Sequence, residues 1–254
     1  MYSSSNKPPG GESPTLQNQG RVPSWKRALD LICCLAVLPG LAFCTLIMAL
    51  VMKVVSPGPV FFLQERVGYL GRRFKIYKFR TMKVGAETAN HQAYFKELVG
   101  TNAPMQKLDA KGDSRLIPGG WLLRASGLDE LPQLINVLRG EMSIVGPRPC
   151  LPAEYDLYLP WQRERFITMP GLTGLWQVSG KNRTTFDEMI RLDIRYAKTK
   201  SLAMDLRIMA STPIALIKQI YDIRVGRLSK EQLMQTRPPM PVSRLQVPEV
   251  VGNR

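Results

Sequence analysis

Asp129 and Glu130 are adjacent carboxylates in a position that suits phosphate or metal chemistry. They lie near the beginning of an apolar stretch, Leu122–Gly140, in which four residues recur at helical spacing: Leu131, Leu134, Ile135 and Leu138. Carboxylates in a first helical turn face unpaired N–H groups and the positive end of the helix dipole, which keeps them ionised at neutral pH. An ionised Asp can attack phosphorus or hold a divalent cation, although carboxylates at helix starts are also common simply as caps.

A second candidate is Arg148, in the segment GPRP that begins eight residues beyond this helix. Proline on both sides of the arginine fixes the backbone, so the guanidinium is held in one place. A rigidly presented guanidinium suits a phosphate, because its planar donors match phosphate oxygens. An ordinary surface turn is the alternative for this segment.

Two further segments carry cations that can meet an anionic ligand. Residues 66–83 interleave aromatic side chains with seven cations: Arg66, Arg72, Arg73, Lys75, Lys78, Arg80 and Lys83. Such a stretch binds phosphates, lies on anionic lipid or is a solvated basic face. Later in the chain, glycines at 171, 174 and 180 precede Lys181 and Arg183, and glycines let backbone and cations approach an anion closely.

Composition narrows the chemistry. The chain carries 35 Lys and Arg against 20 Asp and Glu, a formal charge of +15, which favours a polyanionic partner such as nucleic acid, phosphorylated substrates or anionic lipid. The one histidine, His91, and four cysteines without metal-ligand spacing leave little material for Ser-His-Asp, Cys-His or multi-histidine metal sites. Acid, base or nucleophile roles therefore fall to carboxylates, Lys or Tyr.

An uncharged run of 22 residues, Leu31–Met52, is long enough to cross a bilayer. Basic residues flank it on both sides, namely Arg21, Lys26, Arg27 and Lys53, so the positive-inside rule places both ends in the cytoplasm. Pro39 and Gly40 inside the run favour a bend, and a re-entrant helix hairpin in one leaflet resolves the conflict. A kinked spanning helix and a buried core helix remain alternatives.

The remaining elements predict an α+β protein. The segments VFFLQE and RRFKIYKFRTM, joined by RVGYLG, predict a β-hairpin, and residues 186–224 predict two helices with broad apolar faces. We expect a disordered tail over 1–21, a re-entrant membrane hairpin over 22–55, a small mixed catalytic domain with amphipathic surface helices over 56–225, and a C-terminal tail over 226–254.

Seven motifs in order carry a resemblance to a known family: KRALD, the apolar run broken by proline, SPGPVFF, QERVG, FKIYKFRTM, LDELPQLINVLRGEMSIVGPRP and PGLTGLWQVSGKN. Together they resemble the monotopic phosphoglycosyl transferases, also called bacterial sugar transferases, over roughly residues 22–225. The resemblance implies that Lys26, Asp30 and Pro39 belong to the membrane hairpin. It places the catalytic domain on the cytoplasmic face of a bacterial inner membrane.

The resemblance also implies a ping-pong reaction. Asp129 would attack the β-phosphate of a UDP-sugar, UMP would leave, and the aspartyl phosphosugar would pass to polyprenyl (undecaprenyl) phosphate. It implies a supporting role for Glu130, Mg²⁺ at both carboxylates, and phosphate or nucleotide contacts from five cations: Lys78, Arg124, Arg148, Lys181 and Arg183. We include Arg80, from the same basic motif as Lys78, among the phosphate contacts.

This interpretation makes the chain an enzyme of exopolysaccharide, capsule, O-antigen or related glycan assembly, with anionic lipid and other glycan enzymes as partners and no nucleic acid. Two alternatives stay open. The first is a non-enzymatic basic protein of the membrane surface, and the second is a family member that acts as a partner for other glycan enzymes.

Overall fold

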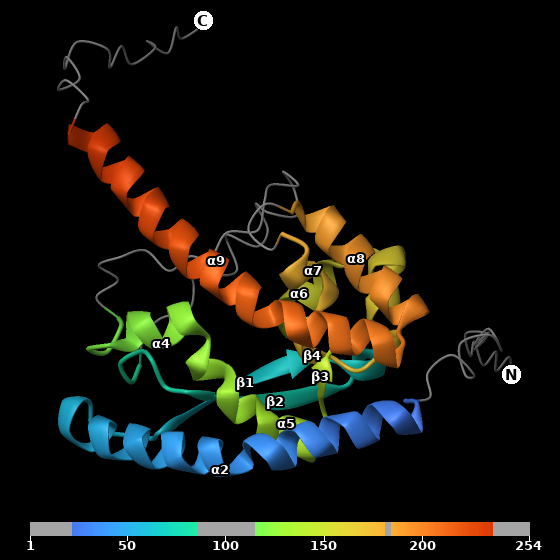
Figure 1. Cartoon of the computed structure of the whole chain (residues 1–254), viewed down its shortest axis with the longest axis horizontal. Coiled ribbons are helices and arrows are strands. Elements are labelled where there is room, and N and C mark those ends of the chain that lie inside the picture. Colours follow the sequence, from blue (N-terminus) through green and yellow to red (C-terminus); the bar gives the residue numbers. More distant parts are fainter. Residues whose placement is uncertain (1–21, 86–114, 181–183, 236–254) are drawn as a thin grey trace, which may run out of the picture.

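The computed structural model describes residues 22–85, 115–180 and 184–235. Within these ranges the chain is a mixed α+β protein, as predicted, in which helices surround two small two-stranded sheets (Figure 1). The elements in chain order are α2 (Ser24–Val55), β1 (Phe61–Val67), η1 (Tyr69–Gly71), β2 (Arg73–Phe79), α4 (Gly120–Ser126), η2 (Leu128–Gln133), α5 (Leu134–Leu138), β3 (Ser143–Val145), α6 (Pro152–Leu157), η3 (Pro160–Ile167), β4 (Gly171–Thr173), α7 (Leu175–Val178), α8 (Phe186–Thr199) and α9 (Leu202–Gln235).

The predicted β-hairpin is confirmed. Strands β1 and β2 pair antiparallel from Phe61 opposite Phe79 to Val67 opposite Arg73. Two residues of β2, Ile76 and Phe79, are buried in one apolar cluster with residues of α5 that include Val137. The hairpin therefore packs onto the segment that carries the two candidate carboxylates.

Strands β3 and β4 form a short parallel pair whose backbones approach unusually closely at two glycines. A Cβ added to Gly146 would overlap the carbonyl oxygen of Met169, and one added to Gly171 would overlap the amide nitrogen of Gly146. Only residues without a side chain fit at this crossing. It fixes the starting point of the GPRP segment.

The membrane hairpin expected over 22–55 is not confirmed. Helix α2 runs without interruption from Ser24 to Val55 and contains Pro39 in its interior. A proline removes one helical hydrogen bond at a cost of about 3 kcal/mol, which the other hydrogen bonds of this 32-residue helix can offset. Packing also holds the second half of α2, because Leu41 and Met52 are buried against the rest of the chain.

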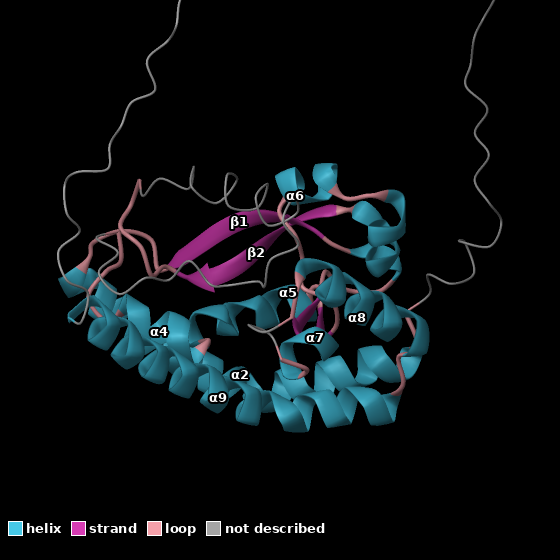
Figure 2. Ribbon diagram, turned by 90° about the horizontal axis from the view of Figure 1, so that it is seen from above, coloured by secondary structure: helices cyan, strands magenta, loops and turns pink. Residues whose placement is uncertain are grey.

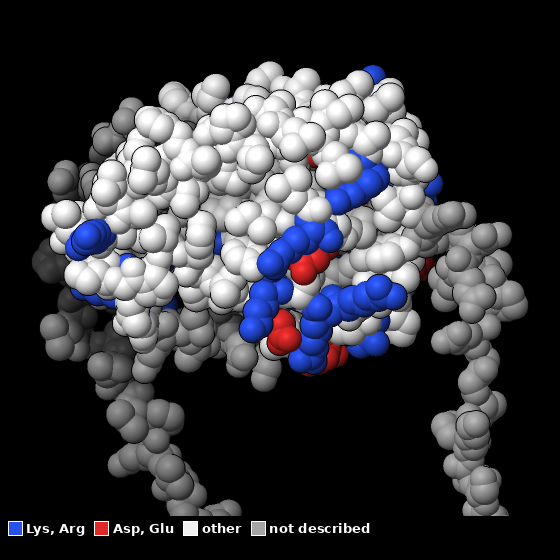
Figure 3. Space-filling model, turned by 90° about the horizontal axis from the view of Figure 1, so that it is seen from below, with Lys and Arg blue, Asp and Glu red and all other residues white. Residues whose placement is uncertain are grey.

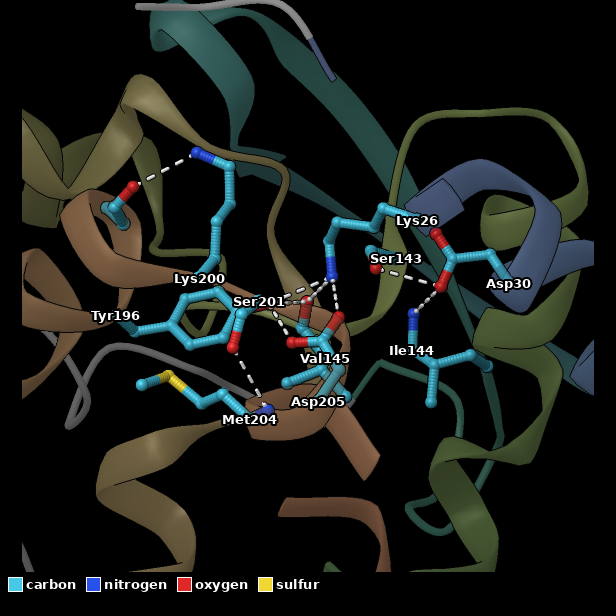
Figure 4. A network of polar contacts seen from close by, with 11 residues as sticks. Lys26, Asp30, Ser143, Ile144, Val145, Tyr196, Lys200, Ser201, Met204 and Asp205 are labelled. Carbon is cyan, nitrogen blue, oxygen red and sulfur yellow. Dashed lines mark hydrogen bonds and ion pairs between the residues drawn. The ribbon is translucent and has the colours of Figure 1, made fainter. Parts of the chain in front are cut away.

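The N-terminal end of α2 is fixed to the domain by a buried ion pair. The Lys26 ammonium lies 2.6 Å from Asp205 Oδ2 and also donates to the Tyr196 hydroxyl and the Val145 carbonyl, each at 2.8 Å (Figure 4). Lys26 and Asp205 are each 1% exposed at the side chain. One lysine thus joins α2, β3, α8 and α9.

A carboxylate one turn further along α2 makes a second attachment. Asp30 Oδ1 accepts hydrogen bonds from Ser143 Oγ and from the backbone N–H of Ile144, both at 2.9 Å (Figure 4). The residues that the resemblance assigned to a membrane hairpin, Lys26 and Asp30, therefore anchor α2 to strand β3.

Two helices follow β4 and the short helix α7, as predicted from residues 186–224. Helix α9 includes Pro213 and continues to Gln235, so the expected boundary at residue 225 falls inside a helix. The expected tails at 1–21 and 236–254 lie outside the described residues, as does His91.

One side of the molecule is apolar. Helices α2, α4 and α9 lie along the same side (Figure 2), and the view from below shows a broad uncharged area beside a region where Lys and Arg gather (Figure 3). We call the most exposed apolar side chains of these helices the apolar face: Ile32, Leu35, Phe43, Leu46, Leu50, Val54, Trp121, Leu122, Leu206, Ile214, Ile217 and Tyr221. Among the described helices, α2 is the one that could cross a membrane by length and composition.

Candidate active site

The two carboxylates lie on a tight turn rather than on an α-helix. Gly127, with a left-handed φ of 74°, ends α4, and Asp129 and Glu130 open the 3-10 helix η2. Pro132 stands inside η2 and has no N–H to donate, so it cannot contribute a helical hydrogen bond. The expected first helical turn is therefore confirmed at Asp129 and Glu130, but it is a 3-10 turn, and the α-helical part, α5, begins only at Leu134.

Lys78 brings a cation directly to this turn. Its ammonium lies 2.8 Å from Glu130 Oε1, with the lysine side chain 17% exposed and the glutamate 35% exposed. Asp129 is buried, at 8% exposure. Three residues that were predicted for the site, Lys78, Asp129 and Glu130, are thus brought together by the packing of η2 on β2.

Asn136 fixes that packing and was not among the predicted site residues. Its Oδ1 accepts from the N–H of Tyr77 at 3.1 Å, and its Nδ2 donates to the carbonyl of Lys75 and to Glu141 Oε2, each at 2.7 Å. The amide thereby satisfies the β2 backbone groups on both sides of Ile76 and holds α5 beside β2. A polar residue in the middle of the apolar segment LINVL was the available signal.

The backbone of the GPRP segment is held on two sides. Cys150, which follows it, exchanges two backbone hydrogen bonds with Val67 at the end of β1, at 2.8 and 3.3 Å. On the other side, the carbonyl of Arg148 accepts from Arg165 Nη2 at 2.9 Å. Arg148 is therefore presented from a fixed backbone, as the two prolines predicted.

Arg165 is itself part of a buried network. It pairs with Asp193 Oδ2 at 2.5 Å and donates to the Tyr158 hydroxyl at 2.9 Å. Burial opposes the charge of Arg165, but Asp193 and, to a smaller degree, Tyr158, Cys150 and Glu154 together outweigh burial, so the pKa of the guanidinium lies above its ordinary value. Arg165 is thus a permanent cation that supports the Arg148 backbone.

A second residue that the site prediction omitted is Arg66, in β1. Its side chain is buried beside the GPRP segment, with Nη2 2.7 Å from Gln64 Oε1 and Nη1 3.4 Å from the carbonyl of Pro149. Burial, followed by the neighbouring charge of Arg148, lowers the pKa of Arg66 to about 10, so it remains cationic at neutral pH. The basic pattern of residues 66–83 marked Arg66 only as one of seven cations.

The pKa of Lys78 shows that these charges act on one another. Burial lowers it, Glu130 raises it, Arg66 and Arg148 lower it further, and Asp129 raises it. Three cations and two carboxylates therefore form one cluster, which we call the charge cluster: Lys78, Arg66, Arg148, Asp129 and Glu130.

The other predicted contacts have different positions. Arg80 donates to Ser56 Oγ at 3.0 Å, to the Ser56 carbonyl and, at 2.7 Å, to the Pro59 carbonyl, so it fixes the turn after α2. Arg124 is half-buried in the last turn of α4. Lys181 and Arg183 lie outside the described residues. A phosphate contact from each of these cations stays a prediction.

The carboxylates also fit the ion that the resemblance implies. No group of three or more His, Cys, Asp or Glu that could hold a metal occurs in the described ranges. Mg²⁺ does not need one, because it is commonly held by one or two carboxylates together with substrate phosphates and water. Asp129 and Glu130 are such a donor set.

Several known proteins are similar to this chain over most of its length. Galactosyl transferase CpsE of Streptococcus agalactiae is 39% identical over 193 residues, covering 74% of this chain and 41% of CpsE. The UDP-glucose:undecaprenyl-phosphate glucose-1-phosphate transferase of Caulobacter vibrioides is 39% identical over 220 residues, covering 82% of this chain and 74% of that protein. Exopolysaccharide production protein ExoY of Sinorhizobium fredii is 35% identical over 187 residues, covering 74% of this chain and 83% of ExoY.

The lengths differ between these relatives. The chain spans 41% of CpsE and 40% of the UDP-galactose-lipid carrier transferase of Erwinia amylovora, so it corresponds to only part of each of them. The family described as bacterial sugar transferase matches residues 21–219, which include the whole charge cluster. On this match and these relatives, the chain belongs to the bacterial sugar transferase family.

Proposed function

We propose that this protein transfers a sugar 1-phosphate from a UDP-sugar to undecaprenyl phosphate, releasing UMP. The observation that carries the proposal is the charge cluster, in which a buried aspartate stands beside a Lys–Glu ion pair and two guanidiniums. The names of the relatives support the acceptor, since the Caulobacter vibrioides protein is named as a glucose-1-phosphate transferase to undecaprenyl phosphate. The reaction would be an early step of exopolysaccharide or capsule assembly.

The reaction proceeds in two steps on Asp129. In the first, an Asp129 carboxylate oxygen attacks the β-phosphorus, the bond from that phosphorus to the oxygen bridging the α-phosphate breaks, and UMP leaves with its electron pair. In the second, a phosphate oxygen of undecaprenyl phosphate attacks the same phosphorus and releases the carboxylate. Two displacements replace one difficult transfer between two anions.

The neighbouring residues make the attack feasible. Lys78, Arg66 and Arg148 reduce the repulsion between an anionic nucleophile and an anionic phosphate. Glu130, which lies 2.8 Å from the Lys78 ammonium, keeps that charge beside the reacting groups. Mg²⁺ bound at Asp129 and Glu130 would supply further neutralisation of phosphate charge.

The apolar face provides the surface on which a lipid-linked acceptor can be reached. Eleven large apolar side chains of α2 are at least 40% exposed: Ile32, Leu35, Val37, Leu38, Phe43, Leu46, Ile47, Leu50, Val51, Val54 and Val55. An exposed apolar area of this extent marks a membrane or protein contact. We propose that this side of the molecule lies on the cytoplasmic face of the bacterial inner membrane.

Release of UMP tests the proposal. The full chain in nanodiscs would be mixed with Mg²⁺, undecaprenyl phosphate and one UDP-sugar at a time from a panel of hexoses and N-acetylhexosamines. We expect UMP release with at least one donor, formation of the lipid-linked sugar in equal amount, and loss of both products when EDTA removes the metal. Absence of product with every donor would contradict the proposal and favour a partner role in glycan assembly.

A further inference from the structure

Arg66 is a buried cation that has no direct ion-pair partner in the described part of the chain; the more distant charges of Glu154 and Glu130 favour its charged form. It is 5% exposed, and its two hydrogen bonds go to uncharged acceptors, the Gln64 amide and the Pro149 carbonyl. No carboxylate of the described ranges lies within ion-pair distance of it, and its Nε has no hydrogen-bond partner there. Buried charges are normally paired, because removing a charge from water is costly.

Arg165 shows how the same region treats a guanidinium with a purely structural role. Arg165 is also buried and contacts the same segment, but Asp193 lies 2.5 Å from it and matches its charge. The Nε of each arginine is without a partner among the described residues, so the contrast between them lies in charge. Two adjacent carbonyls, of Arg148 and Pro149, are thus held by two guanidiniums of which only one has a carboxylate.

The neighbour of Arg66 is a second cation, Arg148. Within the described ranges the guanidinium of Arg148 makes no hydrogen bond or ion pair, and its charge lowers the pKa of Arg66. Two like charges held together in a partly buried site repel each other unless an anion joins them. A phosphate fits this place, because each guanidinium can donate two parallel hydrogen bonds to it.

We propose that Arg66 is a phosphate-binding residue that forms, with Arg148, a two-guanidinium site for one phosphate group beside Lys78 and Glu130. The proposal rests on the proposed function and deepens it, because it names a residue of the phosphate site. The phosphate is that of the nucleotide or that of the lipid acceptor, which share the same chemistry.

Direct binding of matched probes tests the assignment. The full-length D129N chain in nanodiscs, which cannot form the aspartyl intermediate, would be titrated with UMP, uridine, farnesyl phosphate and farnesol. Each pair differs only by the phosphate. The variants are R66Q and R66K, and the control is R73Q, which removes an exposed arginine of the same hairpin, 60% exposed and paired with Glu65.

We expect R66Q to weaken binding of one phosphate probe, or both, by about 10- to 100-fold, as for loss of one charge-assisted contact, while uridine and farnesol bind as before. A loss confined to UMP assigns the site to the nucleotide, and a loss confined to farnesyl phosphate assigns it to the acceptor. R73Q should bind all four probes like the D129N parent. Unchanged phosphate binding in R66Q, or equal losses for charged and uncharged probes, would overturn the proposal.

R66K keeps the charge but not the planar fork, so it should show a several-fold loss for the same phosphate probes. If R66Q does not fold, R66K decides alone: a loss confined to phosphate probes supports the site, and unchanged binding overturns it. Failure of the transferase proposal is recognised separately, because the native chain would then release no UMP while Arg66-dependent phosphate binding persists.

Discussion

At the scale of single residues, the electrostatics of the site is set by what surrounds Asp129. A carboxylate approaching a diphosphate meets a like charge, and nearby cations reduce that repulsion most effectively where water is excluded. Lys78 provides one such cation, 2.8 Å from Glu130, and burial lowers its pKa from the ordinary value of 10.5. Lys78 is therefore expected to lose its charge at a lower pH than an ordinary lysine.

This difference gives a pH prediction for Lys78. A lysine is protonated below its pKa, so a lowered pKa means that Lys78 loses its charge at a lower pH than an ordinary lysine does. We expect kcat/KM for the UDP-sugar to fall on the alkaline side before pH 10.5. K78R, which cannot lose its charge in this range, should move that alkaline limb to higher pH while lowering the maximum rate.

A pH–rate profile of the native chain and K78R checks this expectation. The matched control is K198R on α8, because Lys198 is exposed and pairs with Glu164 away from the charge cluster. K198R should reproduce the native profile. An alkaline limb at the same pH in K78R and the native chain would rule out Lys78 as the titrating group.

Residues whose roles are local could be predicted from the sequence, whereas those defined by long-range packing could not. Asp129 and Glu130 are neighbours, and Arg148 lies between two prolines, so type and spacing pointed to each. Asn136 and Arg66 act through contacts 59 and 83 positions away in sequence, with Tyr77 and Pro149. No periodicity in a single sequence shows such pairs.

At the scale of elements, the position of the site depends on the contacts that hold α2 against β3 and against the segment after η2. The Lys26–Asp205 pair is buried at both side chains, whereas the Lys198–Glu164 pair, at 2.6 Å, is 54% and 45% exposed. Removing one partner of a buried pair leaves an uncompensated charge inside the protein. Removing one partner of an exposed pair leaves a charge that water solvates.

The two pairs should therefore differ in stability. We expect K26M to lose about 3–5 kcal/mol of unfolding free energy and K198A less than about 1 kcal/mol. Thermal unfolding of the chain in detergent, followed by circular dichroism, would show a large fall in midpoint for K26M alone. The double variant K26M/D205L should recover part of the loss. Equal midpoints for K26M and K198A would contradict a stabilising role for the buried pair.

A second prediction at this scale concerns the crossing of β3 and β4. A Cβ at Gly146 would overlap the Met169 carbonyl oxygen, so G146A must displace backbone and should lower both the thermal midpoint and UMP release. G40A is the matched control, because a Cβ there meets nothing within 4 Å and lies within a helix. It should leave activity unchanged and stabilise by about 0.5–1 kcal/mol. Native-like stability of G146A would show that the crossing can relax.

The elements themselves were predicted unevenly, for physical reasons. The β-hairpin and the two helices α8 and α9 follow from alternation and helical spacing, which are local signals. The hairpin expected in α2 is not confirmed, because a proline biases a helix locally, whereas burial of Leu41 and Met52 holds the helix from its contacts with the domain. The 3-10 form of η2 similarly depends on Gly127 and Pro132 acting together.

At the scale of the whole molecule, the apolar face and the region where Lys and Arg gather predict a protein that rests on an anionic bilayer with three helices (Figure 3). If α4 and α9 take part, a charge placed on them weakens attachment even though α2 is intact. We expect W121E and I214E each to lower partitioning onto vesicles of anionic lipid by about tenfold or more, as for one large apolar side chain.

Leu157 gives the matched control, because it is 41% exposed but lies on α6, on the opposite side of the molecule from α2, α4 and α9 (Figure 2). L157E should partition like the native chain. Unchanged partitioning of W121E and I214E would mean that α2 alone attaches the protein to the membrane.

The central claim is that Asp129 carries the phosphosugar, and trapping that intermediate tests it most directly. The native chain and D129N would be mixed with Mg²⁺ and the UDP-sugar that supports turnover, without undecaprenyl phosphate, then quenched and analysed by mass spectrometry of peptides. We predict a phosphosugar adduct on the peptide containing Asp129, one UMP released per adduct, and neither in D129N. Full turnover by D129N, or an adduct on another residue, would contradict the account.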